Sequence, residues 1–238
     1  MPLTAFRRAA RVVRDDLALF GWRNGPLYLL ARAIERSTRG HCRLIKYYFA
    51  AQPVPATDAP ATRKSTRTRI YEAHAGDPIV AQFPRPPDVI AWRFAVGARC
   101  FAADIDGELV GFIWFKHGQY DEDEVRCEYR LEPSRDIVWE FDVYLAPRFR
   151  MSRAFQQLWQ AAHAFLRREG YRWSVGRTSA FNAVSLAAHR RLAPRTLATG
   201  IFLVAGRFQL ALLSIAPFVH VGLRERARPH LLIRAPTQ

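Results

Sequence analysis

Two acidic side chains, Glu140 and Asp142, lie two residues apart in the apolar run VWEFDVYL, which has the composition of a β-strand. Because alternate residues of a strand point the same way, the sequence predicts both carboxylates on one face of a sheet. A carboxylate on such a strand can accept a proton, directly or through a water, from a nucleophile. Asp142 is interpreted as an acid that pairs with a basic side chain, and Glu140 is the better candidate of the two for accepting such a proton.

An arginine-rich bend follows this strand in the run YLAPRFRMSRAF. Pro147 ends the strand, and Arg148, Arg150 and Arg153 precede a helix. Guanidinium groups bind phosphate oxygens and the N-terminus of a helix attracts negative charge. The bend is therefore expected to attract anions.

A second candidate segment is the run FNAVSLAAHRRLA, which is predicted to be a short helix entered through Asn182. The same run carries His189, whose ordinary pKa lies near neutrality, so this side chain can donate a proton in catalysis. The alternative is a surface histidine on a basic helix, beside Arg190 and Arg191. Both interpretations stay open at this point.

The elements that position these residues alternate between strand and helix signals from Arg69 onward, which favours an α/β (α+β) domain. Asp106-Gly107 is the strongest hairpin signal in the chain. The stripe in SRAFQQLWQAAHAFLRREG predicts a long helix that ends at Gly170, and two apolar strands are expected to turn at Gly206. The run QYDEDEVRCEYRLEPSRD is expected to be a loop.

The first 52 residues are expected to form an amphipathic helical segment, with one helix over residues 3–20, a break at Gly21 and a second helix that ends at Gly40. Residues 53–68 are rich in Pro, Thr and Arg and show no hydrophobic period, so they are interpreted as a linker. Residues 69–238 are then the main domain.

The order of elements between Gly107 and Ala193 resembles that of the GNAT superfamily of N-acyltransferases. The resemblance implies a mixed, mostly antiparallel sheet flanked by helices. In that family a loop R-x-x-G-x-G/A holds the pyrophosphate of CoA through backbone amides. Pro147 and Arg150 are in register with the motif, but Arg153 and Phe155 occupy its two small-residue positions, where glycine lets the backbone approach phosphate closely.

The resemblance also implies the activity, which is transfer of an acyl group from acetyl-CoA or a longer acyl-CoA to an amine by direct attack on the thioester. Glu140 would be the base or the residue that orients a water, and His189 stands where the family often has a tyrosine that protonates the departing thiolate. The residues that would contact the acyl-CoA are Tyr144 and Leu145 on the strand, Arg148, Arg150 and Arg153 at the phosphates, and Asn182 at the pantetheine arm.

A different class of function is compatible with the same residues. The altered loop can belong to a non-catalytic GNAT-like binding protein, in which the fold is retained for packing or for binding a partner. In that case the protein would attach to a membrane or to a partner protein through its N-terminal helices.

The formal net charge is +15, and arginine supplies nearly all of the basic groups. Such a field attracts anions of any kind, including nucleotides, acidic lipids and nucleic acid. No nucleic-acid recognition motif accompanies the charge, so nucleic acid is not an expected partner. The N-terminal helices combine arginines with apolar residues, a pattern shared by helices docked on a core and helices that lie on an anionic bilayer.

The acidic run Asp121-Glu122-Asp123-Glu124 has two interpretations. It could select a cationic acceptor, which would be a small-molecule or lipid-linked amine. The alternative is a solvated loop whose acids pair with nearby arginines.

The remaining candidates predict no further chemistry. The other histidines lack the spacing of metal ligands, so no metal site is expected. Three cysteines without paired spacing indicate a reducing compartment, and the N-terminus has no unbroken apolar stretch of the kind that signal peptides require. The protein is therefore expected in the cytoplasm, with a peripheral membrane contact as an additional interpretation.

Overall fold

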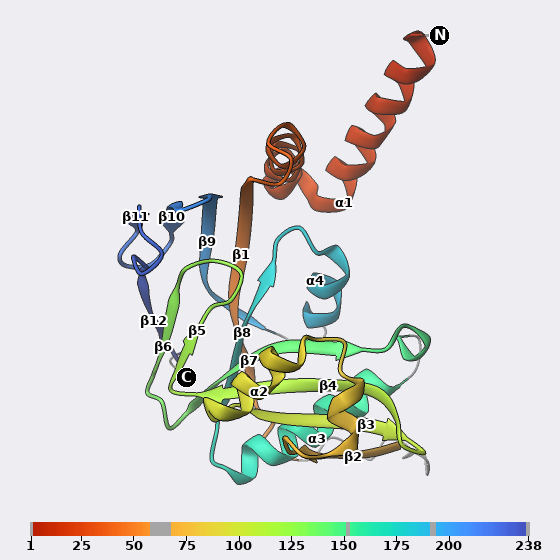
Figure 1. Cartoon of the computed structure of the whole chain (residues 1–238), viewed down its shortest axis with the longest axis vertical. Helices are drawn as coiled ribbons and strands as arrows, with labels where there is room; N and C mark the ends of the chain where they lie inside the picture. The colour runs from red at the N-terminus through yellow and green to blue at the C-terminus, as the bar shows by residue number, and fades with distance from the viewer. Residues whose placement is uncertain (1, 58–67, 151–152, 191–193, 237–238) are drawn as a thin grey trace. The chain divides into compact units, whose positions relative to one another are not determined.

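The computed structural model describes residues 2–57, 68–150, 153–190 and 194–236 (Figure 1). Their elements, in chain order, are α1 (Pro2–Ser37), β1 (Cys42–Pro53), β2 (Thr68–Ala73), the 3₁₀ helix η1 (Pro78–Gln82), α2 (Pro87–Ala95), β3 (Arg99–Ile105), β4 (Glu108–His117), β5 (Gln119–Asp121), β6 (Glu128–Glu132), β7 (Ile137–Leu145), the 3₁₀ helix η2 (Pro147–Phe149), α3 (Ala154–Arg168), β8 (Trp173–Ser179), α4 (Ala183–Arg190), β9 (Arg195–Ala205), β10 (Phe208–Leu213), β11 (Val219–Gly222) and β12 (His230–Arg234).

The chain divides into two compact units, which are described separately below. The first unit contains Met1–Ala50, Asp121–Tyr129 and Arg177–Leu232. The second unit contains Ala51–Tyr120, Arg130–Gly176 and Ile233–Gln238.

The second unit is built on strands in the order β8-β7-β4-β3-β2. The pairs β2/β3, β3/β4 and β4/β7 are antiparallel, and β7/β8 is parallel. The β3–β4 hairpin turns at Asp106 and Gly107, which have φ values of 53° and 85°. A tight hairpin turn of this kind needs positive φ at both central residues, and the predicted hairpin is confirmed.

Helices α2 and α3 cover opposite faces of this sheet (Figure 1). On one face the ring of Phe94 in α2 lies 4.8 Å from that of Trp114 in β4. On the other face Phe101 lies 4.7 Å from Phe165 of α3 and 6.2 Å from Phe115 of β4. Because neighbours along β4 point to opposite faces, Trp114 and Phe115 belong to two separate core layers.

The long helix predicted after the arginine-rich bend is α3, and its buried stripe faces the sheet. The buried members of this stripe are Ala154, Leu158, Trp159, Ala162, Phe165 and Leu166. The helix is followed by Gly170 at φ 84°, the left-handed position at which many helices end.

In the first unit, α1 changes direction at Gly21, whose φ of 71° and ψ of 175° are not helical (Figure 1). The predicted break is confirmed. The two halves of α1 then pack on each other, because Asp16 accepts a hydrogen bond of 2.7 Å from Arg32. A Cβ at Gly25 would lie 2.7 Å from the Leu17 side chain, so the halves approach closely only with glycine there.

The remaining strands of the first unit follow the order β11-β10-β9-β1. β9 and β10 are antiparallel and turn at Gly206, as predicted. In β1, the buried side chains Ile45, Tyr47 and Phe49 alternate with more exposed ones, the period of a strand. Helix α1 ends at Ser37, and from Cys42 onward the segment predicted to be helical is a strand instead. The domain boundaries at residues 52 and 68 stay a prediction, and residues 58–67 of the linker lie outside the described part of the chain.

The prediction of a loop over residues 119–136 is wrong in part, because this run contains β5 and β6, which join β12 in a small sheet of order β12-β6-β5. In β6 the buried Tyr129 and Leu131 alternate with the exposed Arg130 and Glu132. The acidic residues that precede β6 made this short alternation hard to recognise in the sequence. The fold class is confirmed as mixed α/β with a mostly antiparallel sheet, and no helix within the described residues is long and apolar enough to cross a membrane.

Candidate active site

Strand β7 is paired unequally on its two sides within the second unit. Its pairing with β8 runs from Ile137↔Trp173 to Glu140↔Gly176, whereas its pairing with β4 continues to Leu145↔Gly111. Beyond Glu140, the side of β7 that faces away from β4 therefore has no ladder partner within the described residues of this unit. Backbone amides and carbonyls on that side without a ladder partner can bind a ligand, since such groups need hydrogen-bond partners.

A β-bulge follows Glu140 in the same strand. The β4 partners Phe112 and Trp114 face Tyr144 and Phe141, so β7 has one residue more than β4 in this interval. Asp142 lies within the bulge at a φ of 46°, in the left-handed region that non-glycine residues rarely adopt. A bulge at this point turns the following backbone groups away from a regular ladder.

Two arginines hold the Asp142 carboxylate. Arg85 donates to both of its oxygens, with Nε 2.8 Å from Oδ2, and Arg93 donates to Oδ2. The Arg93 guanidinium is almost fully buried and lies 5.5 Å from the ring of Trp114 and 5.2 Å from that of Phe141. The Asp142 side chain is therefore anchored on the face of the sheet that carries Trp114 and α2.

Glu140 lies on the opposite face, because it is paired with Phe115. The prediction that Glu140 and Asp142 share a face is wrong, since the bulge interrupts the alternation between them. The interpretation of Asp142 as an acid that pairs with a basic side chain is confirmed by its arginines.

Glu140 is 3% exposed, and each of its carboxyl oxygens accepts a hydrogen bond from a described side chain. Oε1 accepts from Gln52 Nε2 at 2.9 Å, and Oε2 accepts from Ser174 Oγ at 2.6 Å. Burial raises the pKa of Glu140 to about 7, although both hydrogen bonds act to lower it. A Cβ at Gly176 would lie 2.6 Å from the Glu140 Cγ, so glycine is required beside the carboxyl group.

At the end of β7, the side chains of Tyr144 and Leu145 are half-buried. The Tyr144 ring stacks on Phe112 at 5.2 Å, so this side chain serves packing. A Cβ at Gly111 would lie 2.5 Å from the Tyr144 carbonyl oxygen, which requires glycine on the neighbouring strand.

The arginines of the bend have different surroundings. Arg148 pairs with Glu108 and lies 4.6 Å over the ring of Phe149. Arg150 Nε donates to the Leu145 carbonyl at 3.4 Å, and Arg153 is exposed at the N-cap of α3. Met151 and Ser152, inside the predicted phosphate loop, lie outside the described residues.

Phe155 is half-buried, and its ring lies 6.3 Å from that of Trp159, one turn further along α3. Within the described part of the chain, the N-cap residue Arg153 makes no side-chain capping hydrogen bond to α3. The first backbone amides of a helix have no partner inside the helix, so this N-terminus can attract an anion.

Asn182 and His189 belong to the first unit, whereas the other predicted site residues belong to the second. Asn182 Oδ1 accepts from the Ser185 amide at 3.0 Å, which confirms it as the cap of α4. His189 is half-buried, and burial lowers its pKa below the ordinary 6.5. The imidazole is therefore mostly neutral at neutral pH.

Residues 67–193, more than half of the chain, match the model of the acetyltransferase (GNAT) family. The chain belongs to the GNAT family. No curated protein matches the sequence significantly.

Several solved structures are similar to this GNAT chain at low identity. A conserved protein of unknown function from Staphylococcus epidermidis is 8% identical with a TM-score of 0.47; the match covers 71% of this chain and 65% of that one, just under two thirds. A GNAT family acetyltransferase from Elizabethkingia anophelis, with acetyl-CoA bound, is 15% identical with a TM-score of 0.40 over 53% of this chain and 75% of that one. The acetyltransferase AAC(6')-Iy, in complex with a bisubstrate analogue, is 21% identical with a TM-score of 0.40 over 53% and 90%.

Sequence reasoning proposed Glu140 as a candidate in this GNAT chain but missed the residues that hold it and Asp142 in place. These are Gln52, Ser174, Arg85 and Arg93. One usable signal was Gly176 inside a β-strand, since glycine in a strand often marks a close approach of another group. The other was Gln52, a polar residue at the end of the alternating apolar run of β1.

The acidic run of the GNAT chain is engaged with arginines inside the first unit. The Glu122 side chain is fully buried and accepts two hydrogen bonds from Arg177, one of them 2.7 Å long. Asp121 pairs with Arg228 at 2.8 Å, and Glu124 accepts a hydrogen bond from Tyr47. Pairing with arginines is confirmed, but Glu122 is buried rather than solvated. No cluster of three potential metal ligands occurs among the described side chains.

Proposed function

We propose that this GNAT protein transfers an acyl group, acetyl or longer, from an acyl-CoA thioester to an amine by direct attack. The observation that supports the proposal most is the one-sided pairing of β7 beyond Glu140, followed at once by the bulge at Asp142. This arrangement leaves strand backbone free to bind an extended ligand beside a carboxyl group with a pKa of about 7.

The second unit contains residues that can bind the acyl-CoA donor. The backbone of β7 up to Tyr144 and Leu145 can hydrogen-bond an amide-containing arm, and the N-terminus of α3 with Arg150 and Arg153 can hold phosphates. Arg148 can contact the phosphates only when its ion pair with Glu108 is broken. When bound, acyl-CoA supplies the thioester carbonyl as the electrophile.

Glu140 is the proposed general base. Its pKa of about 7 leaves a large fraction ionised near neutral pH, so the carboxylate can take a proton from an ammonium acceptor, directly or through a water. Gln52 and Ser174 orient its two oxygens. Asn182 as the pantetheine contact and His189 as the proton donor to the leaving thiol are proposed from the family resemblance. Because burial lowers the pKa of His189, the second role requires the small protonated fraction of the imidazole.

Thiol release tests this proposal directly. The full chain is incubated with acetyl-CoA or longer acyl-CoAs and a panel of small and lipid-linked amines, and free CoA is measured. We expect turnover that depends on an amine and falls about a hundredfold in Glu140→Gln, the usual size of a general-base contribution. The matched control is Glu169→Gln, a half-exposed carboxylate of the same unit, which should keep full activity.

A non-catalytic binding protein is the competing function, and a specific observation favours it. Arg153 and Phe155 stand at the two small-residue positions of the family loop, so the backbone there approaches a pyrophosphate less closely. Acyl-CoA binding without any amine-dependent thiol release, and unchanged in Glu140→Gln, would favour this function over catalysis.

A further inference from the structure

The second half of α1 carries apolar side chains on its solvent face. Trp22, Pro26, Leu30 and Ala33 lie four, four and three residues apart, so they follow one face of the helix and form what we call the α1 stripe. All four are exposed, with Trp22 at 80% and Leu30 at 50%. Exposed apolar groups aligned in this way usually mark a binding surface.

The opposite face of the same helix is the one that holds it in the first unit. Asn24 Oδ1 accepts hydrogen bonds of 2.9 Å from Lys46 and Tyr48 of β1. The Tyr28 ring lies 5.6 Å from that of Phe181, and Ala31 is buried. The α1 stripe therefore points away from the contacts that anchor the helix.

Arginines flank the α1 stripe. The Arg23 guanidinium lies 5.1 Å over the Trp22 ring, and Arg36 and Arg39 follow at the end of the helix. No ion pair recorded for the described residues involves Arg23, Arg36 or Arg39. Their charges are therefore available to an anionic partner.

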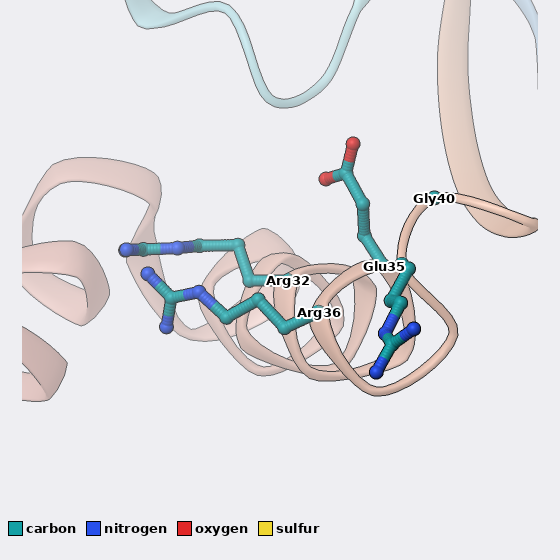
Figure 2. Close-up of a pocket in the computed structure, with 5 residues that line it drawn as sticks. Arg32, Glu35, Arg36 and Gly40 are labelled. Carbon is teal, nitrogen blue, oxygen red and sulfur yellow. The ribbon is translucent and has the colours of Figure 1, made fainter.

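An open hollow of about 470 Å³ adjoins this end of the helix and is lined by Arg32, Glu35, Arg36, Arg39 and Gly40. Figure 2 shows the Arg32 and Arg36 side chains extending in the same direction, while the Glu35 carboxylate points elsewhere. Arg32 donates a hydrogen bond of 2.7 Å to Asp16. Of these two arginines, Arg36 is therefore the one whose charge is available to an anionic partner.

We propose that the α1 stripe and its flanking arginines bind the surface of a bilayer that contains anionic lipid. Apolar groups at the level of the headgroups, with arginines beside them, satisfy both parts of such a surface. A nucleic acid would match the arginines but leave Leu30 without an apolar partner. A second copy would cover Leu30 but bring together two chains of net charge +15, which repel each other.

The test is sedimentation of the full chain with vesicles of phosphatidylcholine, with or without phosphatidylglycerol, at low and high salt. We expect binding to the mixed vesicles only, weakened by salt. The double substitution Trp22→Ala/Leu30→Ala should lower the partition coefficient about tenfold or more. The matched control is Trp92→Ala/Leu223→Ala, which removes an exposed Trp and an exposed Leu elsewhere and should bind like the wild type.

A second readout separates membrane contact from a change in folding. Trp22 fluorescence should shift to shorter wavelength on addition of the mixed vesicles, and Trp22→Phe should retain binding but lose that part of the shift. Equal binding to both kinds of vesicle, equal loss in the double variant and its control, or self-association through the stripe would each overturn the proposal. Acyl-CoA binding is measured on the same variants, so a failure of the membrane proposal is distinguishable from a failure of the proposed acyltransferase activity.

Discussion

The Glu140 carboxyl group is buried and accepts hydrogen bonds from Gln52 and Ser174. Burial and hydrogen bonding have opposite effects on its pKa. Burial is the larger effect and raises the pKa to about 7, while the hydrogen bonds from Gln52 and Ser174 favour the charged form. A carboxyl group with this pKa is partly protonated at neutral pH. It can therefore both accept and return a proton near neutral pH, which an ordinary glutamate does poorly.

The first prediction concerns the pH dependence of turnover. If Glu140 acts as the base, kcat should rise with pH through about 7 and level off above it. Ser174→Ala removes a hydrogen bond that lowers the pKa, so the rising limb should move to higher pH. A profile of kcat against pH for both proteins checks this, and an unmoved limb in Ser174→Ala would contradict the assignment.

The second prediction concerns stability and uses the same pKa. The unfolded chain releases the Glu140 proton near the ordinary 4.5, whereas the folded chain keeps it to about 7. The group's contribution to stability is therefore full below about pH 4.5 and is lost as the pH rises through about 7. Glu140→Gln stays neutral, so its stability relative to the wild type should increase across this window. Urea unfolding at several pH values measures the difference, and a constant or opposite trend would rule out a raised pKa.

At the scale of the elements, β7 depends on what surrounds its bulge. Gly111 and Gly176 allow the neighbouring strands to approach its backbone and the Glu140 side chain. Arg85 and Arg93 anchor Asp142, which has the unfavourable φ of 46°. Non-glycine residues in the left-handed region persist only when surrounding contacts hold them there.

The third prediction tests this anchoring. Arg93→Met removes a buried guanidinium from Asp142 and should lower kcat about tenfold with little change in KM for the amine, because the bulge backbone shifts. Stability should fall by about 2 kcal/mol, the scale of a lost charged hydrogen bond. Arg99→Met, which breaks a more exposed pair with Glu72 in the same unit, is the control and should leave kcat unchanged. Equal kcat values in the two variants would argue against a positioning role for Arg93.

Sequence patterns predicted the elements that have a local sequence signal. Asp106-Gly107 predicted the β3–β4 turn, Gly21 the break in α1, and the apolar stripe and Gly170 the helix α3. They did not predict the bulge, because bulges depend on the register with a partner strand, which no local pattern specifies. For the same reason Glu140 was identified as a candidate, but its contacts with Gln52 and Ser174, distant in sequence, were not.

At the scale of the whole molecule, the two units contain different buried polar clusters. In the first unit, Arg177 bonds the buried Glu122 and lies 4.2 Å over the Tyr47 ring. Burial raises the pKa of Glu122 despite the arginine, so the pair is held in an apolar setting. This acidic run therefore contributes to the interior of its unit, which leaves less of it to select a cationic acceptor.

The fourth prediction follows from that burial. Arg177→Met leaves the buried Glu122 without its guanidinium partner and should cost about 3–5 kcal/mol of the free energy of unfolding. Arg228→Met breaks the more exposed pair with Asp121 and should cost about 1 kcal/mol or less. Urea unfolding of both variants decides the matter, because similar small losses would mean that the Glu122 pair contributes no more than a surface pair.

The most direct test of the whole account is calorimetric titration of the full chain with acetyl-CoA and longer acyl-CoAs. We predict saturable binding with a dissociation constant of about micromolar for at least one of them. Arg153→Glu, which places a negative charge at the N-terminus of α3, should weaken that binding about tenfold or more. Absence of binding heat at every chain length, or equal affinity in Arg153→Glu, would contradict the claim that this GNAT fold holds an acyl-CoA along β7 and α3.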